Sequence, residues 1–460
     1  GLLLIFRNNA SLGGVNILAL FVEKKYHIHS GKVILSIDLL VVLLAMTSYS
    51  VEQLLYSTLG FFVLTSVLGR YHKKAPISQR PAQTSKKIEN MDFSNLKVGH
   101  ILTSENKSYG FNQTTITTAI FGNQNATDAS NTNAESRLTN NELNLEFNSK
   151  YVLGQFKAKV NLTNYTYGYD TILNKNSNIN TLKLESAAVS FGADWNARIK
   201  NFNLNADASI TPGTGRLSGN YLKGTAVYEK DSLFAIKGSI VISSKSPNFN
   251  TLLHQSSYDD YNWQHNFSNV NIRDLGFLLS SKWLNGSVHF TNIDNYTYFN
   301  QDSKPQQFEN QITYLKLKVN REFKFWKFAL DNTIMYQNVS NGSSVFRVPE
   351  FVTRNTIYYA DHWFKKDAMF VNIGITFKYF SEYNANAYNP LLAEFRLQDE
   401  ETIGFPTFDV FFNAKVRRTR LYLKVDNVTS GFTKKNYFSA PTYPYRDFTV
   451  RFGLVWNWFI

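Results

Sequence analysis

The last stretch of the chain, residues 445–460, reads YRDFTVRFGLVWNWFI and alternates apolar with polar or small residues. The apolar positions are Phe448, Val450, Phe452, Leu454, Trp456 and Trp458. A period of two predicts a β-strand with one apolar face. In a soluble sheet such a face packs into a core. An apolar face that ends in tryptophans is more typical of a barrel strand that contacts lipid, with its aromatic residues at the membrane interface.

The composition agrees with alternation along the whole chain. The 460 residues are 15% aromatic, yet the mean hydropathy is only −0.27. Beyond Tyr71 no apolar run reaches the roughly 18 residues of a membrane-spanning helix. The absence of cysteine excludes disulfide scaffolds, thiol chemistry and cysteine-based zinc sites. The net charge of +13 is spread through strands and turns, so nucleic acid is not an expected partner.

Residues 1–70 differ from the rest of the chain. Two apolar runs, residues 33–48 and 51–69, are each close to the length of a membrane helix, and residues 11–32 predict a shorter helix that ends in a basic turn. The segment resembles a fragment of the YitT family of inner-membrane proteins. The residues that carry this resemblance are Ser11, Leu12, Gly13, Gly14, Asn16, Ile17, Lys24, Lys25, Gly31 and Asp38.

Residues 71–95 form a basic linker that contains prolines. Lysine and arginine lie at both ends of the helix pair, which predicts that both ends face the cytoplasm. An outer-membrane barrel cannot assemble from that side, so we interpret residues 1–70 as a foreign fusion that by itself would lie in the inner membrane. The chain begins at Gly1 without a signal-peptide pattern, so we expect it to be incomplete at its N-terminus.

Residues 96–460 predict an all-β, antiparallel transmembrane barrel. Leu143, Leu145 and Phe147, for example, alternate with asparagine and glutamate. Short links at residues 229–231, 285–286, 364–367 and 417–419 alternate with long polar stretches, as in outer-membrane barrels. This spacing predicts about 16 strands, with 14 to 18 tenable, because bacterial barrels keep an even number. Residues 104–140 are Asn-rich and predict weak strands with a long loop.

The C-terminal part of the chain resembles the putative porin family of outer-membrane β-barrels. The resemblance is carried by residues 371–390, 405–427 and 437–458, and upstream by residues 245–249, 262–269 and 295–299. It covers about residues 140–460. It implies an outer-membrane location, contact with the lipid bilayer, insertion by the outer-membrane barrel assembly machinery through the terminal strand, and passage of small polar solutes. Two features depart from the family: its N-terminal part, with the signal peptide, is missing or replaced, and the chain ends in Ile460.

If the apolar face points outward, the polar face lines a lumen. The candidate pore-lining residues are Lys157, Lys159, Lys237, Lys316, Lys318, Lys378, Lys415, Lys424, Arg451, Asp207, Asp331, Asp409 and Asp426. With Glu146 they make nine cations against five anions, which predicts a weak anion preference. Alternatively, these groups form cross-strand pairs in a wet interior.

Catalytic, metal and cofactor sites are not expected. His27 and His29 lack further ligands nearby, and Gly13-Gly14 lacks the strand and lysine of a phosphate loop. Asp409 and Asp426 lie at polar-face positions without a partner that would shift a pKa for glycoside hydrolysis. The scattered histidines form no Ser/His/Asp set; they are His254, His265, His289 and His362.

A second function class stays open. The terminal segment also resembles the end of TonB-dependent receptors, which implies a receptor-type or plugged barrel that binds a partner, glycan or nutrient. Nothing before residue 95 resembles a plug domain. Neither the solute nor the oligomeric state follows from the sequence.

Overall fold

The computed structural model describes residues 96–113, 118–123, 130–148, 153–169, 182–230, 233–432 and 437–456. All of them belong to one compact unit, Glu89–Ile460. The predicted helical segment 1–70, the linker 71–95 and Trp458 lie outside the described residues. The predicted fusion therefore stays a prediction.

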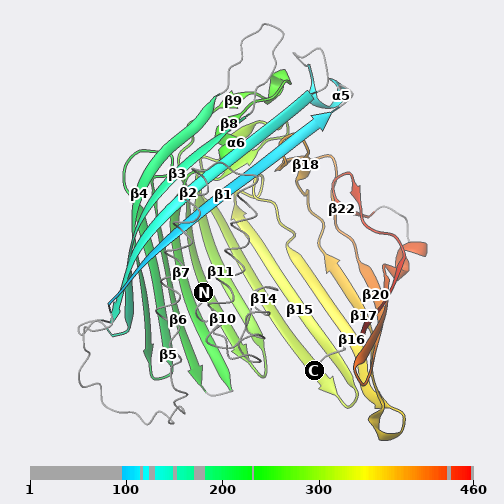
Figure 1. Cartoon of the computed structure of the whole chain (residues 1–460). Helices are drawn as coiled ribbons and strands as arrows, with labels where there is room; N and C mark the ends of the chain where they lie inside the picture. Colours follow the sequence, from blue (N-terminus) through cyan, green and yellow to red (C-terminus); the bar gives the residue numbers. More distant parts are fainter. Residues whose placement is uncertain are drawn as a thin grey trace, which may run out of the picture. The chain divides into compact units, whose positions relative to one another are not determined.

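One antiparallel sheet of sixteen strands dominates this unit, and its strands follow one another in chain order (Figure 1). The all-β antiparallel class and the predicted strand number are confirmed for the described residues. Closure into a barrel would need β1 to pair with β24, and this pair is not among the described strand pairings. The strands are β1 (Lys97–Gln113), β2 (Ser130–Asn148), β3 (Gln155–Tyr169), β4 (Lys183–Ile199), β5 (Phe202–Thr211), β6 (Gly219–Lys230), β7 (Phe234–Lys245), β10 (Val270–Ser281), β11 (Asn285–Asp294), β14 (Ile312–Phe325), β15 (Phe328–Asn341), β16 (Phe351–Trp363), β17 (Met369–Phe380), β20 (Thr407–Val416), β21 (Thr419–Asp426) and β24 (Thr449–Trp456).

Short turns and long connections alternate along the sheet, as predicted. Turns occur at the predicted links 364–367 and 417–419. The predicted link 229–231 is placed too early, because Glu229 and Lys230 belong to β6; the Leu233 N–H donates to the Lys230 carbonyl at 3.1 Å. The predicted Asn285-Gly286 turn is wrong, because both residues belong to β11. The chain reverses just before them: the Ser281 hydroxyl donates to the Leu284 carbonyl at 2.7 Å, and Asn285 Oδ1 accepts from the Ser281 N–H at 3.2 Å. The asparagine therefore stabilises the turn from outside it.

The polar stretch 104–140 contains more strand than predicted. β1 runs to Gln113 and pairs with β2 from Ser130 onward. The pairing needs only backbone N–H and C=O groups, so polar side chains do not prevent it. Between these two strands the described residues include the one-turn helix α5 (Thr118–Phe121).

The two faces of the sheet have opposite character. Leu330, Ile357 and Ile375 lie directly opposite one another on one face and are 39%, 53% and 46% exposed. On the terminal strand and just before it, Phe448, Val450, Phe452, Leu454 and Trp456 are at least half exposed. Monomeric soluble proteins rarely expose contiguous apolar patches this extensive. We call this the outer face.

Aromatic side chains cluster on the outer face close to the short turns. Trp326, Phe328, Tyr359 and Trp363 form a chain of ring contacts with centroids 5.4 to 6.5 Å apart. Similar pairs flank other short turns: Phe147 with Phe156, and Phe202 with Tyr228. Such a girdle is typical of the membrane interface of a barrel.

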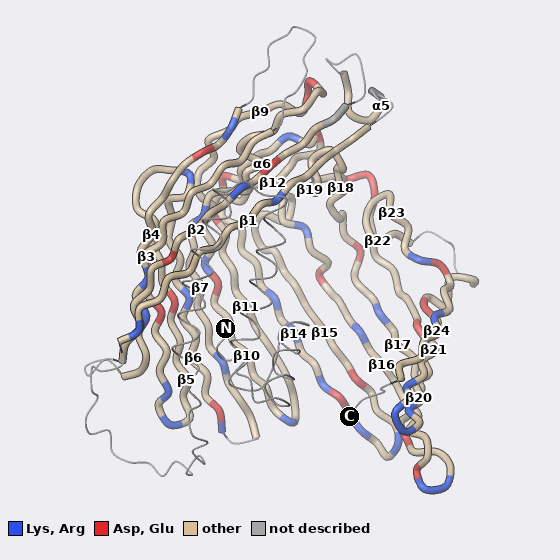
Figure 2. The backbone as a smooth tube through the Cα atoms, viewed as in Figure 1, with Lys and Arg blue, Asp and Glu red and all other residues tan. Residues whose placement is uncertain are grey.

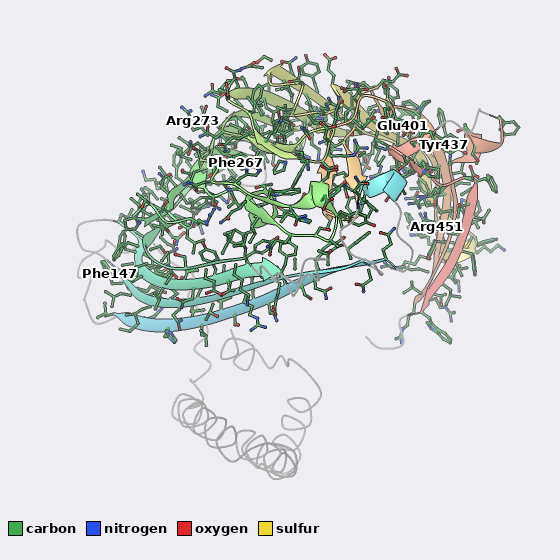
Figure 3. The ribbon with its side chains drawn as sticks, turned by 90° about the horizontal axis from the view of Figure 1, so that it is seen from above. Phe147, Phe267, Arg273, Glu401, Tyr437 and Arg451 are labelled. Atoms are coloured by element: carbon green, nitrogen blue, oxygen red, sulfur yellow. The ribbon has the colours of Figure 1, made fainter. Side chains whose placement is uncertain are left out.

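The long connections carry small elements of their own. These are a four-stranded sheet of β12 (Thr297–Phe299), β13 (Pro305–Gln307), β18 (Ala387–Asn389) and β19 (Glu394–Arg396); the pair β8 (Leu253–His254) and β9 (Trp263–Gln264); the pair β22 (Phe438–Ala440) and β23 (Tyr443–Pro444); and short helical turns α6 (Phe249–Leu252), η2 (Asp259–Tyr261), η3 (Lys365–Asp367) and η4 (Val428–Gly431). Seen from above, the sheet curves (Figure 3). Among the described residues, no helix is both long and apolar enough to cross a membrane.

Candidate functional site: the inner wall and the loop cap

Four long connections fold together into one packed layer. We call residues 118–123, 246–269, 295–311 and 381–406 the loop cap. Its buried core contains residues from every one of these connections: Phe121, Tyr258, Tyr261, Phe299, Leu391 and Leu392. The rings of Phe121 and Tyr258 lie 5.3 Å apart, although their connections follow β1 and β7. The loop cap therefore joins strands that are distant in the sheet.

Asn389 is the polar centre of the loop cap and is only 5% exposed. Its amide donates to the Tyr261 hydroxyl at 3.0 Å and to Ser303 Oγ at 2.9 Å. Its Oδ1 accepts the N–H of Leu391 at 3.0 Å. A single buried side chain thus satisfies groups from three connections, which fixes their relative positions.

The connection between β7 and β10 packs onto the face of the sheet opposite the outer face. Tyr165, Tyr167 and Tyr169 on β3 form a buried cluster with Leu252 and Leu253. The ring of Tyr165 also stacks on Phe249, with centroids 5.0 Å apart. These tyrosines alternate with the outward residues of β3, so the loop covers the inner face. We call this face the inner wall.

His254 lies inside the loop cap and is 2% exposed. It stacks on Trp263 at 4.8 Å, and its Nδ1 donates to the Tyr261 carbonyl at 2.7 Å. Burial lowers the pKa of His254 to about 4, although hydrogen bonds with the backbone of Tyr261 and Leu391 oppose the shift. His254 is therefore neutral in the closed loop cap at neutral pH.

Acid is expected to loosen the loop cap. Above pH 6.5 both the closed and the opened states hold neutral His254, so pH has no effect through this group. Between pH 6.5 and about 4 only the opened state binds the proton, so stability falls as the pH falls. At pH 5 the loss is about 2 kcal/mol. Hydrogen exchange of residues 246–269 at pH 7 and pH 5 measures it.

The control for acid sensitivity is His254→Phe, which keeps an aromatic ring but cannot titrate. Its loop cap should exchange equally at both pH values. Equal acid sensitivity in this variant and in the unaltered protein would contradict the assignment to His254.

All thirteen candidate pore-lining residues lie on the inner wall, as the strand register shows. Figure 2 shows cationic and anionic residues interspersed along the strands. The structure divides the candidates into paired and unpaired groups.

Five of the candidates form one ion-pair cluster on β17, β20, β21 and β24. Asp409 is 1% exposed, and its Oδ2 lies 2.5 Å from Lys378 Nζ and 3.3 Å from Lys424 Nζ. Asp426 is 2% exposed, and its carboxylate lies 2.5 Å from both Lys424 Nζ and Arg451. The backbone N–H of Asn427 also donates to Asp409 at 3.0 Å. We call this group the carboxylate cluster.

A smaller cluster involves two more candidates. Lys159 Nζ lies 2.6 Å from Asp194 and 3.3 Å from Asp207. Lys157 lies 3.7 Å from Glu142, and Asp331 accepts from the Asn320 amide at 3.1 Å. Among the described residues, four candidates have no hydrogen bond or ion pair: Lys237, Lys316, Lys318 and Lys415.

Sequence reasoning missed several partners in these clusters. Asp194 occupies the polar face of β4 and could have been found by alternation alone. Arg446, 3.7 Å from Asp426, lies in a connection where no period marks it. Only the folded structure brings Arg446 to the carboxylate cluster.

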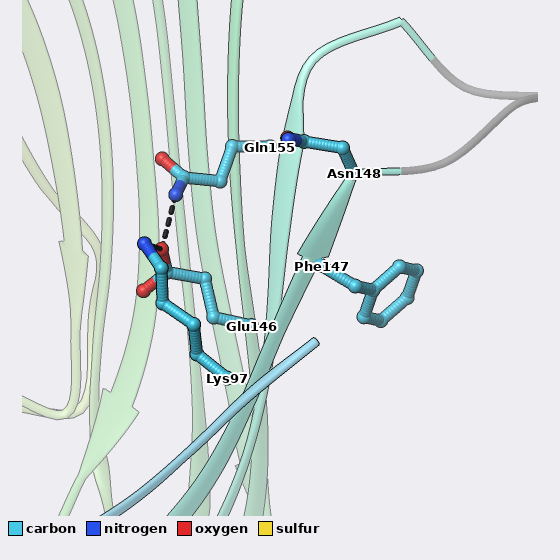
Figure 4. Close-up of a pocket in the computed structure, with 5 residues that line it drawn as sticks. All are labelled: Lys97, Glu146, Phe147, Asn148 and Gln155. Carbon is cyan, nitrogen blue, oxygen red and sulfur yellow. Dashed lines mark hydrogen bonds and ion pairs between the residues drawn. The ribbon is translucent and has the colours of Figure 1, made fainter. Parts of the chain in front are cut away.

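A small cavity of about 250 Å³ lies where β1, β2 and β3 meet (Figure 4). Lys97 Nζ lies 3.1 Å from Glu146, and Gln155 also donates to that carboxylate. Phe147, the next residue, points away from this polar group (Figure 4). The Glu146 carboxylate is already paired with Lys97 and Gln155. Within the described ranges, no group of three or more His, Asp or Glu side chains could hold a metal ion.

Comparison of the sequence with protein families matches residues 16–459 to the putative porin family. The chain belongs to this family. The predicted resemblance is confirmed, and the match begins well upstream of residue 140. No curated protein matches the chain.

Solved structures with a similar fold include siderophore receptors and a copper transporter. The siderophore receptor PirA from Acinetobacter baumannii gives a TM-score of 0.53 at 11% identity, over 79% of this chain and 60% of PirA. A mutant of the ferric enterobactin receptor from Pseudomonas aeruginosa gives a TM-score of 0.52 at 11% identity. The similarity covers 78% of this chain and 59% of the receptor. The copper transporter OprC gives a TM-score of 0.50 at 10% identity. The similarity covers 72% of this chain and 57% of OprC.

At such low identity these similarities show the fold alone. The chain spans less than two thirds of the length of each of these three proteins. The family and the fold together indicate an outer-membrane protein.

Proposed function

We propose that this porin-family protein forms a closed barrel in the outer membrane through which small polar solutes diffuse. The observation that carries the proposal is the polarity of the sheet, which is the reverse of that in a soluble protein. Apolar residues and an aromatic girdle occupy the outer face, and ion pairs occupy the inner wall. Lipid would contact the outer face, and water would contact the inner wall. Insertion by the barrel assembly machinery through the terminal strand is part of the proposal.

The loop cap gives the proposed channel its constriction. The connection between β7 and β10 covers the inner wall of β3, and Phe121 joins it from the connection after β1. Such inward packing narrows the space that a solute crosses. We therefore expect passage of small solutes and exclusion of large ones.

Planar-bilayer recording of the full chain, refolded and reconstituted, tests the proposal. Discrete conductance steps are expected, with a reversal potential that indicates a weak anion preference because cations exceed acids among the candidate inner-wall residues. Absence of conductance from correctly folded protein would overturn passive passage. Clear cation selectivity would overturn the anion preference alone.

A receptor-type or plugged barrel is the second candidate function. It is supported by the four connections that pack into a single buried core in the loop cap. In that case the protein would bind a small ligand at the cap without steady conductance. Saturable ligand binding together with closed channels would favour this function over diffusion.

A further inference from the structure

A separate cavity of about 720 Å³ lies on the inner wall close to the short turns, at the opposite end of the strands from the loop cap. Its volume is within the range of small-molecule sites. Residues of β16, β17, β20, β21 and β24 line it, among them His362, Asn372, Asn413, Lys415, Arg420 and Tyr422. The carboxylate cluster lies further along the same strands and does not contribute to this lining.

The charges in this cavity are not balanced: Lys415, Arg417 and Arg420 line it against one carboxylate, Asp367. Lys415 and Arg420 lie directly opposite each other on β20 and β21, which brings their Cβ atoms to within about 5 Å. Within the described part of the chain, neither forms an ion pair, and the same holds for Arg417 in the adjoining turn. Like charges directly opposite each other destabilise a sheet. This pair contrasts with Lys378 and Lys424, which both contact Asp409.

Two amides add unused hydrogen-bonding groups. Asn372 and Asn413 lie opposite each other on β17 and β20. Asn413 is two residues from Lys415 on the same face of β20. The Asn372 side-chain oxygen is buried without a hydrogen-bond partner, and neither amide bonds another described residue. The oxygen and nitrogen of such an amide are interchangeable by rotation, so its NH₂ group can be turned toward a ligand. Amide N–H groups and cations both suit an oxyanion.

An aromatic surface completes the cavity. Tyr422 lies opposite Asn413 on one side and Gly453 on the other. A Cβ atom at position 453 would overlap the Tyr422 ring, so the glycine allows the ring to lie flat over β24. Tyr422 as a whole is 42% exposed. It offers a face on which the apolar part of a ligand can rest.

We propose that this cavity binds a small organic oxyanion, with its carboxylate or phosphate between Lys415 and Arg420 and its apolar or ring portion on Tyr422. Guanidinium and ammonium groups recognise both oxyanions by charge-assisted hydrogen bonds. The inference deepens the proposed function and rests on it, because the site lies on the wall of the proposed channel. It adds the chemical class of solute and the place where it is held.

Isothermal titration calorimetry of the refolded full chain in detergent tests the site, with phenyl phosphate and inorganic phosphate as probes. Phenyl phosphate should bind more tightly than inorganic phosphate. The double variant Lys415→Gln/Arg420→Gln should lose about a hundredfold in affinity for both, because it removes two charge-assisted hydrogen bonds to the oxyanion. Tyr422→Ser should weaken phenyl phosphate and leave inorganic phosphate unchanged.

The matched control is Lys230→Gln/Lys282→Gln, which removes the same charge from other hairpins and should change affinity less than about twofold. Equal losses of probe affinity in both double variants would overturn the site. So would the absence of probe binding to the unaltered protein. Bilayer recording of the same preparation separates the two proposals. If the protein binds phenyl phosphate but shows no conductance, passive passage is rejected and the oxyanion site stands. If it conducts but does not bind the probes, the oxyanion site is rejected and passive passage stands.

Discussion

Replacing Asp409 with asparagine is expected to lower the free energy of unfolding by about 3 kcal/mol. The carboxylate is 1% exposed and lies against two ammonium groups, Lys378 and Lys424. Its neutralisation leaves Lys378 without a counter-charge among the described residues and leaves Lys424 with Asp426 alone. Breaking a buried pair costs about 3 to 5 kcal/mol, and the lower end applies because the lysines are 36% and 37% exposed. Urea titration of the full chain folded into lipid vesicles measures the change.

The control for this substitution is Asp302→Asn. The side chain of Asp302 is exposed, and its carboxylate makes no hydrogen bond or ion pair with the described residues. This variant should stay within about 0.5 kcal/mol of the unaltered protein. Equal stability of Asp409→Asn and Asp302→Asn would show that the carboxylate cluster contributes nothing to the fold.

Ile357→Lys is expected to destabilise the membrane-inserted protein by about 3 kcal/mol, because a charge near the bilayer midplane loses its hydration. Ile357 lies midway along β16 and is 53% exposed. It lies opposite Leu330 on β15 and Ile375 on β17. The outer-face assignment places it in hydrocarbon. Urea titration in vesicles of defined thickness provides the measurement.

The matched control is Ala360→Lys, three residues along the same strand but on the inner wall, opposite Asn372. Its ammonium would contact the hydrated side of the sheet, and the expected loss is below about 1 kcal/mol. If Ala360→Lys proved as destabilising as Ile357→Lys, or more so, the assignment of lipid and water to the two faces would be reversed.

Alternation alone was sufficient to predict the two faces. Phe452 and Leu454 lie on the outer face, and Lys424 and Arg451 lie on the inner wall, as a period of two requires. The prediction succeeded because the side-chain period of a strand is independent of its neighbours. The number of strands followed from the same pattern and from the alternating lengths of the connections.

Pairing within the inner wall was beyond the reach of the sequence. Lys159 meets Asp194 and Asp207 from two further strands, and Lys378 and Lys424 share Asp409. A one-residue change of register would exchange these partners, and no local signal sets the register over such distances. The sequence therefore predicted the charges but not which of them are neutralised.

The sequence by itself determined which residues face each side of the sheet, because that depends only on the alternation of the backbone. The tertiary structure alone decided the loop cap, where Phe121, Tyr258 and Leu391 meet from connections far apart in the chain. It also decided the unbalanced cavity around Lys415 and Arg420. Both depend on which strands become neighbours and how far each is shifted, and these are properties of the whole sheet.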